Sequence, residues 1–348
     1  MTNKKNRVAI VGASGYTGSD LIRLALRHPQ ISIEALTGAT HAGKSIDQVF
    51  PHLSGCDLPS LVTNDEVNWD AIDTVFCGLP HATSQKVINA LPTHLNIIDM
   101  SADFRLRDKK TYEATYGNPH VATELQKIAV YGLSEHYRGE IRNTRLVACP
   151  GCYPTATLLL LLPLVKEGLI DPTDLIIDAK SGVTGAGRAL KQNTLFSEAG
   201  EGMGPYAVAQ HRHAPEIEQE LSVAAGQDIT VNFTPHLIPM SRGELITCYA
   251  KLTSNNNSAK CREVLRERYS NDAFIDISPD GVYPQTQFVR GSNRVMLNAY
   301  DDRIANRVIL IAALDNLVKG SSGQALQNFN IMSNYDEASG LEQIALFP

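Results

Sequence analysis

The segment spanning residues 8–26 most constrains the fold of this 348-residue chain. An apolar run, residues 8–11, leads into Gly12-Ala13-Ser14-Gly15-Tyr16-Thr17-Gly18 and then into an amphipathic stretch, residues 19–26. This order predicts a strand, a glycine-rich loop and a helix, with the glycines spaced as G-x-x-G-x-x-G. Such glycines permit a tight turn and a close backbone approach to a pyrophosphate at the helix N-terminus. Between a strand and a helix, the motif predicts a dinucleotide-binding α/β domain rather than a plain glycine-rich turn.

The end of the next expected strand, residues 31–37, bears on the choice of cofactor. An NAD-selective fold would place Asp or Glu there to hold the ribose 2′-hydroxyl. Instead the chain continues Thr37-Gly38-Ala39-Thr40-His41-Ala42-Gly43-Lys44, and Glu34 lies too early in the strand. Hydroxyl groups, His41 and Lys44 suit a 2′-phosphate, so we expect NADP, with Thr37 and Lys44 among its contacts.

A second informative segment is Cys149-Pro150-Gly151-Cys152, which Tyr153-Pro154-Thr155 and a leucine-rich run follow. A helix is expected at about residues 153–168, which puts Cys152 at its first turn. Backbone N–H groups and the helix dipole favour a thiolate there, and the thiolate is the nucleophilic form. Two other interpretations remain: a buried core cysteine, and a redox pair with C-x-x-C spacing.

Composition and size favour a cytoplasmic enzyme with two domains. The chain is long enough for two sizeable cores, and 43% hydrophobic and 20% charged residues are ordinary for a globular protein. A net charge of -6 argues against a nucleic-acid partner, and six cysteines do not resemble a disulfide framework. The opening residues 1–7 offer no apolar signal segment. The apolar run at 156–165 contains Pro163 and is too short to span a membrane, so no membrane partner is expected.

The order of expected elements divides the chain. Up to about residue 150 strands alternate with helices, for example a strand at 73–77, a helix at 84–91 and a strand at 96–100, which indicates a doubly wound, Rossmann-type unit. We therefore expect a dinucleotide-binding domain at 1–151 and a catalytic and dimerisation domain at 152–314. Residues 315–348 are expected to pack back on the first domain.

The second domain is expected to be α+β with a mostly antiparallel sheet. Its predicted strands are residues 175–180, 230–234, 245–250, 288–289 and 294–297. Residues 305–318 read as a long apolar helix that could return to the first domain.

Further segments along the whole chain carry a family resemblance. They are Gly12-Ala13-Ser14-Gly15-Tyr16-Thr17-Gly18, Gly78-Leu79-Pro80-His81, Asp99-Met100-Ser101-Ala102-Asp103-Phe104-Arg105, Pro150-Gly151-Cys152-Tyr153-Pro154-Thr155, Ser181-Gly182-Val183-Thr184-Gly185-Ala186-Gly187-Arg188, His211-Arg212-His213-Ala214-Pro215-Glu216-Ile217, Thr234-Pro235-His236-Leu237-Ile238-Pro239-Met240, Gly291-Ser292-Asn293 and Asp315-Asn316-Leu317-Val318-Lys319-Gly320. In these segments the chain resembles the N-acetyl-γ-glutamyl-phosphate reductase family, which is related to aspartate-semialdehyde dehydrogenase. One departure is Cys149, a position at which the family varies.

The resemblance implies an oxidoreductase of arginine biosynthesis that uses NADPH to reduce N-acetyl-L-glutamyl 5-phosphate to the 5-semialdehyde with release of phosphate. By resemblance Cys152 attacks the acyl carbon, and the resulting thioester is a better hydride acceptor than the acyl phosphate. A general acid/base is also needed, and histidine suits that role near neutral pH. His213 is favoured because it lies nearest an expected helix start, and His211 is the alternative.

The remaining site residues also follow from the resemblance. Arg105 is expected to hold the leaving phosphate, although a surface Arg paired with Asp103 is an alternative, and Arg188, Glu216 and Arg242 are expected at the substrate. The 181–188 loop is expected to approach the nicotinamide. No metal is implied, and a homo-oligomer, dimer or tetramer, is expected. The implied cofactor contacts are Gly12, Ser14, Gly15, Tyr16, Thr17, Gly18, Gly78, Pro80, Ser181, Gly182, Gly185 and Asn316.

Two other functions stay open. A sister enzyme would reduce a different acidic acyl phosphate, such as a carrier-linked aminoadipyl phosphate or aspartyl phosphate. A non-catalytic NADP-binding redox sensor would use Cys149 to resolve a sulfenic acid on Cys152.

Overall fold

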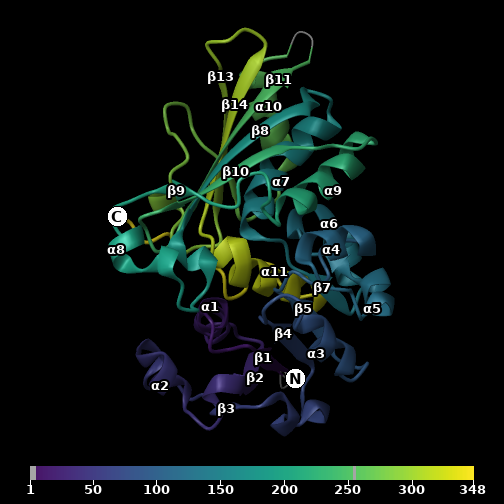
Figure 1. Ribbon diagram of the computed structural model, residues 1–348, viewed down its shortest axis with the longest axis vertical. Helices are drawn as coiled ribbons and strands as arrows, with labels where there is room; N and C mark the ends of the chain where they lie inside the picture. Colours follow the sequence, from purple (N-terminus) through teal and green to yellow (C-terminus); the bar gives the residue numbers. More distant parts are fainter. Residues whose placement is uncertain (1–4, 254–255) are drawn as a thin grey trace. The chain divides into compact units, whose positions relative to one another are not determined.

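The computed structural model describes residues 5–253 and 256–348 (Figure 1). Most of the opening segment considered for a signal peptide, residues 1–4, therefore lies outside the described residues. The chain divides into two compact units, one made of Met1–Pro150 and Ser321–Glu342 and the other of Gly151–Gly320 and Gln343–Pro348. Of the C-terminal stretch assigned to the first domain from sequence, 321–342 lies in the first unit, whereas 315–320 and 343–348 lie in the second.

The first unit is a parallel sheet with helices. Its strands are β1 (Asn6–Val11), β2 (Ile31–Thr37), β3 (Leu61–Val62), β4 (Thr74–Cys77), β5 (Asn96–Asp99), β6 (Val130–Tyr131) and β7 (Leu146–Ala148). Its helices are α1 (Tyr16–Ala25), α2 (Ile46–Val49), α3 (Ser84–Ala90), α4 (Lys109–Tyr116), α5 (Thr123–Ile128), α6 (Ser134–Arg142) and α11 (Gly323–Met332). In Figure 1, α11 is the yellow helix among the blue elements, and it packs against α6 and α1.

The strand order is β3-β2-β1-β4-β5-β7-β6, and all six pairings are parallel. The strands are apolar on both faces because helices cover both faces of a parallel sheet. One hydrophobic core cluster joins Ile88 of α3 to four strand residues, Val11, Val75, Ile97 and Leu146. The direction of strand succession reverses between β1 and β4, which is the switch point where such folds bind dinucleotides. The doubly wound prediction is confirmed.

The second unit is built on a mixed sheet. Its strands are β8 (Ile170–Gly182), β9 (Gly204–Pro205), β10 (Asn232–Ile238), β11 (Glu244–Leu252), β12 (Ile275–Ile277), β13 (Val295–Asp301) and β14 (Arg307–Leu314), and its helices are α7 (Cys152–Lys166), α8 (Phe196–Ala199), α9 (Ala214–Ala225) and α10 (Ser258–Arg268). The order is β12-β13-β14-β11-β8-β10-β9. The pairs β13–β14, β14–β11, β11–β8 and β10–β9 are antiparallel, whereas β12–β13 and β8–β10 are parallel. The expected antiparallel character is therefore only part of the arrangement.

Helix α7 is the central helix of the second unit. It packs against α9, α10, β8, β11 and β14, and every residue from 153 to 165 is buried. A helix surrounded on all sides needs no polar face, which explains the leucine-rich run. In the described part of the chain every helix is too short or too polar to cross a membrane.

Two expectations for the second unit are wrong. Residues 305–318, predicted as a helix, contain strand β14, because its side chains alternate between buried and partly exposed positions at a period of two. Residues 288–289, predicted as a strand, lie at the end of a 3₁₀ turn, Thr286–Phe288. The C-terminal helix that packs with the first unit is instead α11.

Candidate active site

The glycine loop after β1 is shaped by close backbone contacts. Gly12 has φ +81°, and a Cβ there would lie 2.5 Å from the Gly78 carbonyl oxygen, at the end of β4. A Cβ at Gly18 would lie 2.7 Å from the backbone of Ala13. The first glycine therefore allows the tight turn and the last allows the helix to pack on the strand.

The N-terminus of α1 is suited to an anion. Its N-cap is Gly15, which has no side chain to satisfy the first N–H groups. Ser14 lies beside the end of β2, since a Cβ at Gly38 would be 3.1 Å from its hydroxyl oxygen. Thr37 is buried, whereas Lys44 and Pro80 are exposed. These residues lie at the carboxyl ends of β1, β2 and β4, where a dinucleotide would bind.

Cys152 is the first residue of α7, and its N-cap is Gly151. The helix has 15 residues, so its N-terminus offers N–H groups and a positive dipole end to a thiolate. The residue is partly exposed, whereas Cys77, Cys149, Cys248 and Cys261 are buried.

The turn before Cys152 is attached to α9. The buried Glu216 carboxylate accepts a hydrogen bond from the N–H of Gly151 at 2.9 Å. The imidazole of His213, the N-cap residue of α9, occupies the space that a Cβ at Gly151 would fill. Glu216, expected at the substrate, therefore holds the turn that precedes Cys152, and His213 lies directly against that turn.

The two histidines lie in different surroundings. Burial, followed by the charge of Arg212, lowers the pKa of His211 to about 4. Its Nδ1 accepts the backbone N–H of His213 at 3.2 Å, and its ring packs edge-on to the rings of Tyr153 and Tyr206. A neutral, hydrogen-bonded His211 supports the turn that carries His213.

Cys149 lies at the end of β7 with only 1% of its surface exposed. Burial raises the pKa of its thiol to about 12, and Asn328 Nδ2 donates to its sulfur at 3.6 Å. A thiol with such a pKa is a poor resolving nucleophile. These surroundings favour the packing interpretation over the redox one.

Arg105 is largely buried in the first unit. Its Nε donates to the Cys149 carbonyl at 2.8 Å and its Nη2 to the Met100 carbonyl at 3.2 Å. These bonds fix the segments that follow β5 and β7. A role at the leaving phosphate stays a prediction, because two of the guanidinium nitrogens already have backbone partners.

Asn316 links three loops of the second unit. Its Oδ1 accepts the N–H of Gly243 at 2.8 Å, and its Nδ2 donates to Thr184 Oγ1 at 3.0 Å. The Thr184 hydroxyl in turn donates to the Ser241 carbonyl at 2.6 Å. The end of β8, with Ser181 and Gly182, and the loop after it, with Gly185, are thus attached to the turn before β11. Both ends of the Asn316 amide are engaged, so its contact with a cofactor stays a prediction.

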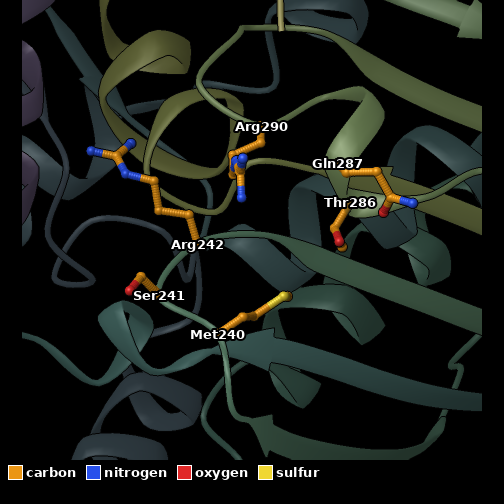
Figure 2. Close-up of a pocket in the computed structure, with 6 residues that line it drawn as sticks. All are labelled: Met240, Ser241, Arg242, Thr286, Gln287 and Arg290. Carbon is orange, nitrogen blue, oxygen red and sulfur yellow. The ribbon is translucent and has the colours of Figure 1, made fainter. Parts of the chain in front are cut away.

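A cavity of about 330 Å³ lies beside these loops. Figure 2 shows the side chains around it, which are Met240, Ser241, Arg242, Thr286, Gln287 and Arg290. Arg242 was expected at the substrate; its Nη1 lies 3.7 Å from Asp315 Oδ1. Sequence reasoning missed Arg290, although it directly precedes the Gly291-Ser292-Asn293 motif. Arg188 is exposed and does not line the cavity.

Two cationic side chains in a partly polar cavity suit an anionic small molecule. Among the described residues, none of the His, Cys, Asp and Glu side chains cluster as a metal site would require.

Two family models cover most of the chain. Residues 7–144 match the semialdehyde dehydrogenase NAD-binding domain, and residues 152–316 match the semialdehyde dehydrogenase dimerisation domain. Among solved structures, aspartate semialdehyde dehydrogenase II from Vibrio cholerae has a TM-score of 0.73 at 16% identity, covering 95% of this chain and 99% of its own. Aspartate semialdehyde dehydrogenase with NADP from Candida albicans has a TM-score of 0.69 at 16% identity, with the same coverage of 95% and 99%. At this identity, the structures show the shared fold.

The curated relatives are much closer in sequence. The N-acetyl-gamma-glutamyl-phosphate reductase of Rhodospirillum rubrum is 51% identical, over 99% of this chain and 100% of the relative. A probable chloroplastic N-acetyl-gamma-glutamyl-phosphate reductase of Arabidopsis thaliana is 49% identical, over 99% of this chain and 86% of the relative. About half of the chain's residues are identical to theirs from end to end. The chain also has a cysteine at the start of α7 and a separate unit with a glycine loop between strand and helix. It therefore belongs to the N-acetyl-gamma-glutamyl-phosphate reductase family.

Proposed function

We propose that this enzyme reduces N-acetyl-L-glutamyl 5-phosphate to N-acetyl-L-glutamate 5-semialdehyde and releases phosphate, as a step of arginine biosynthesis. The names of its relatives support the substrate. The observation that carries the chemistry is Cys152, partly exposed at the first turn of α7 with the His213 imidazole against the preceding residue.

The first half of the reaction is acyl transfer to Cys152. His213 takes the thiol proton, the thiolate sulfur bonds to the acyl carbon, and the bond from that carbon to the phosphate oxygen breaks. Arg242 and Arg290 hold an anionic group of the substrate, which the charge of their cavity supports.

In the second half, the Cys152 thioester becomes a thiohemiacetal, whose oxygen takes the proton that His213 accepted from the thiol in the first half. NADPH, when bound, would supply a hydride to the thioester carbon. His213 then removes the hydroxyl proton of the thiohemiacetal, the carbon–sulfur bond breaks, and the aldehyde leaves with the thiolate restored.

The preference for NADP over NAD is part of the proposal. The Gly12–Gly78 contact and the uncapped N-terminus of α1 suit a dinucleotide. The end of β2 carries no carboxylate for a ribose 2′-hydroxyl, whereas Lys44 is exposed nearby in the chain. A positive side chain there would favour the 2′-phosphate.

We also infer a homo-oligomer, a dimer or tetramer, in the cytoplasm. The dimerisation domain named for residues 152–316 supports the oligomer. The composition, which is typical of globular proteins, and the acidic net charge of -6 support a location in the cytoplasm.

The decisive assay is phosphate-dependent oxidation of N-acetylglutamate semialdehyde with NADP⁺. We expect turnover by the wild type and none by Cys152→Ser, because a serine hydroxyl has a far higher pKa than a thiol, while NADPH still binds. Cys56→Ser, which changes an exposed cysteine, is the matched control and should be fully active. A preference for another aldehyde would point to the sister enzyme, and absence of turnover in the wild type to the redox sensor.

A further inference from the structure

The loop that follows β4 in the first unit is held in a strained conformation. It spans residues 78–83, between β4 and α3, and Ala82 in it has φ +64°. The left-handed region is unfavourable for a residue that carries a Cβ, so an alanine stays there only where its surroundings compensate for the cost. Strained residues of this kind cluster at ligand sites, which makes the loop a candidate for a functional element.

This loop lies where the fold would bind a dinucleotide. A Cβ at Gly12 would lie 2.5 Å from the carbonyl oxygen of Gly78, so the loop begins in contact with the glycine turn after β1. The strands β1 and β4 are neighbours at the switch point of the sheet, and a dinucleotide lies across the carboxyl ends of such strands. Pro80, His81 and Thr83 are exposed, so the loop has surface available for contact with a cofactor.

A single buried carboxyl group holds the loop. Asp103, which follows β5, is 0% exposed, and each of its carboxyl oxygens accepts hydrogen bonds from two donors. Oδ1 accepts the Ala82 N–H and the Tyr112 hydroxyl, both at 2.7 Å. Oδ2 accepts the Ser84 hydroxyl at 2.8 Å and the Gln85 N–H at 3.1 Å. Three of these donors therefore belong to the strained residue and to the first turn of α3.

The backbone of Asp103 is fixed as well. Its N–H donates to Ser101 Oγ at 3.2 Å, and the Ser101 hydroxyl donates to Asp99 Oδ2, at the end of β5, at 2.7 Å. Its carbonyl oxygen accepts a hydrogen bond from His120 Nε2 at 2.8 Å. Asp103 therefore ties the loop after β4 to the end of β5.

We propose that Asp103 is a positioning residue for the dinucleotide: its carboxyl group keeps Ala82 in the left-handed conformation and so fixes the 78–83 loop in the shape that receives the cofactor. This inference rests on the dinucleotide site of the proposed function. Asp103 itself is buried and acts only through the loop. Without its carboxyl group the alanine would leave the left-handed region, and cofactor binding would have to restore that conformation at a cost in affinity.

The test is the affinity for NADPH, measured by fluorescence titration in the absence of substrate. Asp103→Asn is the main variant, because a side-chain amide in either orientation points its NH₂ group at a backbone N–H, that of Ala82 or that of Gln85. We expect the dissociation constant to rise about tenfold, which is the loss typical of one hydrogen bond to a carboxylate.

Tyr112→Phe is the matched control. It removes the fourth donor to Asp103 and leaves the bonds from the 82–85 segment in place. Both variants should lower the melting temperature, because each disturbs a buried hydrogen-bond network, but only Asp103→Asn should weaken NADPH binding. A purely structural role would weaken binding in both variants or in neither.

Two changes at residue 82 test the link to the strained backbone. Glycine adopts φ +64° freely, so Ala82→Gly in the Asp103→Asn background should restore part of the lost NADPH affinity. Ala82→Val leaves Asp103 in place and keeps the test open if Asp103→Asn does not fold. Because a β-branched residue is especially unfavourable at positive φ, Ala82→Val should weaken NADPH binding.

Equal NADPH affinity in wild type and Asp103→Asn would overturn the inference, as would an equal loss in Tyr112→Phe, no recovery in the double variant, or unchanged affinity in Ala82→Val. If wild type binds NADPH and turns over its substrate, each of these results removes only the role of Asp103. Absence of NADPH binding by wild type would instead remove the proposed cofactor, and the inference with it.

Discussion

Replacement of Gly151 by alanine tests whether the His213 imidazole must lie where it does. The backbone of Gly151 has φ -66° and ψ 160°, which alanine adopts without strain. The substitution therefore acts through the added methyl group alone, and that group would overlap the His213 ring.

The size of the effect follows from the overlap. The new Cβ would lie 2.7 Å from His213 Cε1 and 2.8 Å from Cδ2. Carbon atoms in ordinary contact are about 3.5–4.0 Å apart, so the ring must move by about 1 Å. A misplacement of that size costs on the order of 10²-fold in turnover, which is about 2.7 kcal/mol in the barrier. NADPH affinity should be unchanged, because the glycine loop that would bind it is untouched.

The assay compares kcat and NADPH affinity for wild type, Gly151→Ala and His213→Asn. Loss of the acid/base in His213→Asn should cost about 10²–10⁴ in kcat. Gly139→Ala makes the same chemical change on α6, where a Cβ meets nothing within 4 Å, and should leave kcat unaltered. In a His213→Ala background, Gly151→Ala should cost little more, because the ring that it displaces is gone.

Wild-type turnover in Gly151→Ala would refute the reasoning, because the ring would then function in another position. So would full additivity in the double variant, since the alanine would then act on something other than His213. Full activity in His213→Asn would move the acid/base role to His211.

Three further predictions concern the cofactor, the substrate and the second cysteine. Lys44→Gln should weaken NADPH by about 1–3 kcal/mol and leave NADH unchanged in a binding titration; equal losses would mean that another residue reads the 2′-phosphate. Arg290→Gln should raise KM for the acyl phosphate by roughly tenfold or more with kcat within a few-fold, and a loss confined to kcat would count against a binding role. After peroxide treatment, Cys149→Ala and wild type should recover equally with dithiothreitol, because burial raises the pKa of Cys149; slower recovery in the variant would revive the redox interpretation.

Local sequence determined most of the first unit and the position of Cys152 at the start of a helix. The strand–loop–helix order at residues 8–26 is a short-range signal, and β2 occupies the predicted residues 31–37. The helix that begins at Cys152 could also be predicted, because a glycine N-cap and a long apolar run are both visible in the sequence. Such features depend on residues close together in the chain.

Tertiary structure decided the features that depend on distant partners. Residues 307–314 are apolar enough for a buried helix, and they form a strand because β11 and β13 flank them. The sequence favoured His213 over His211 only because His213 lies nearer an expected helix start. The fold distinguishes them by contact: it packs the His213 ring against Gly151 and buries the His211 ring among aromatic rings. Glu244 looks like an ordinary strand residue until the pairing of β11 with β8 and β14 buries its carboxyl group, and that burial raises its pKa to about 8. Burial and electrostatic interaction are properties of the assembled core, so periodicity and motif spacing do not reveal them.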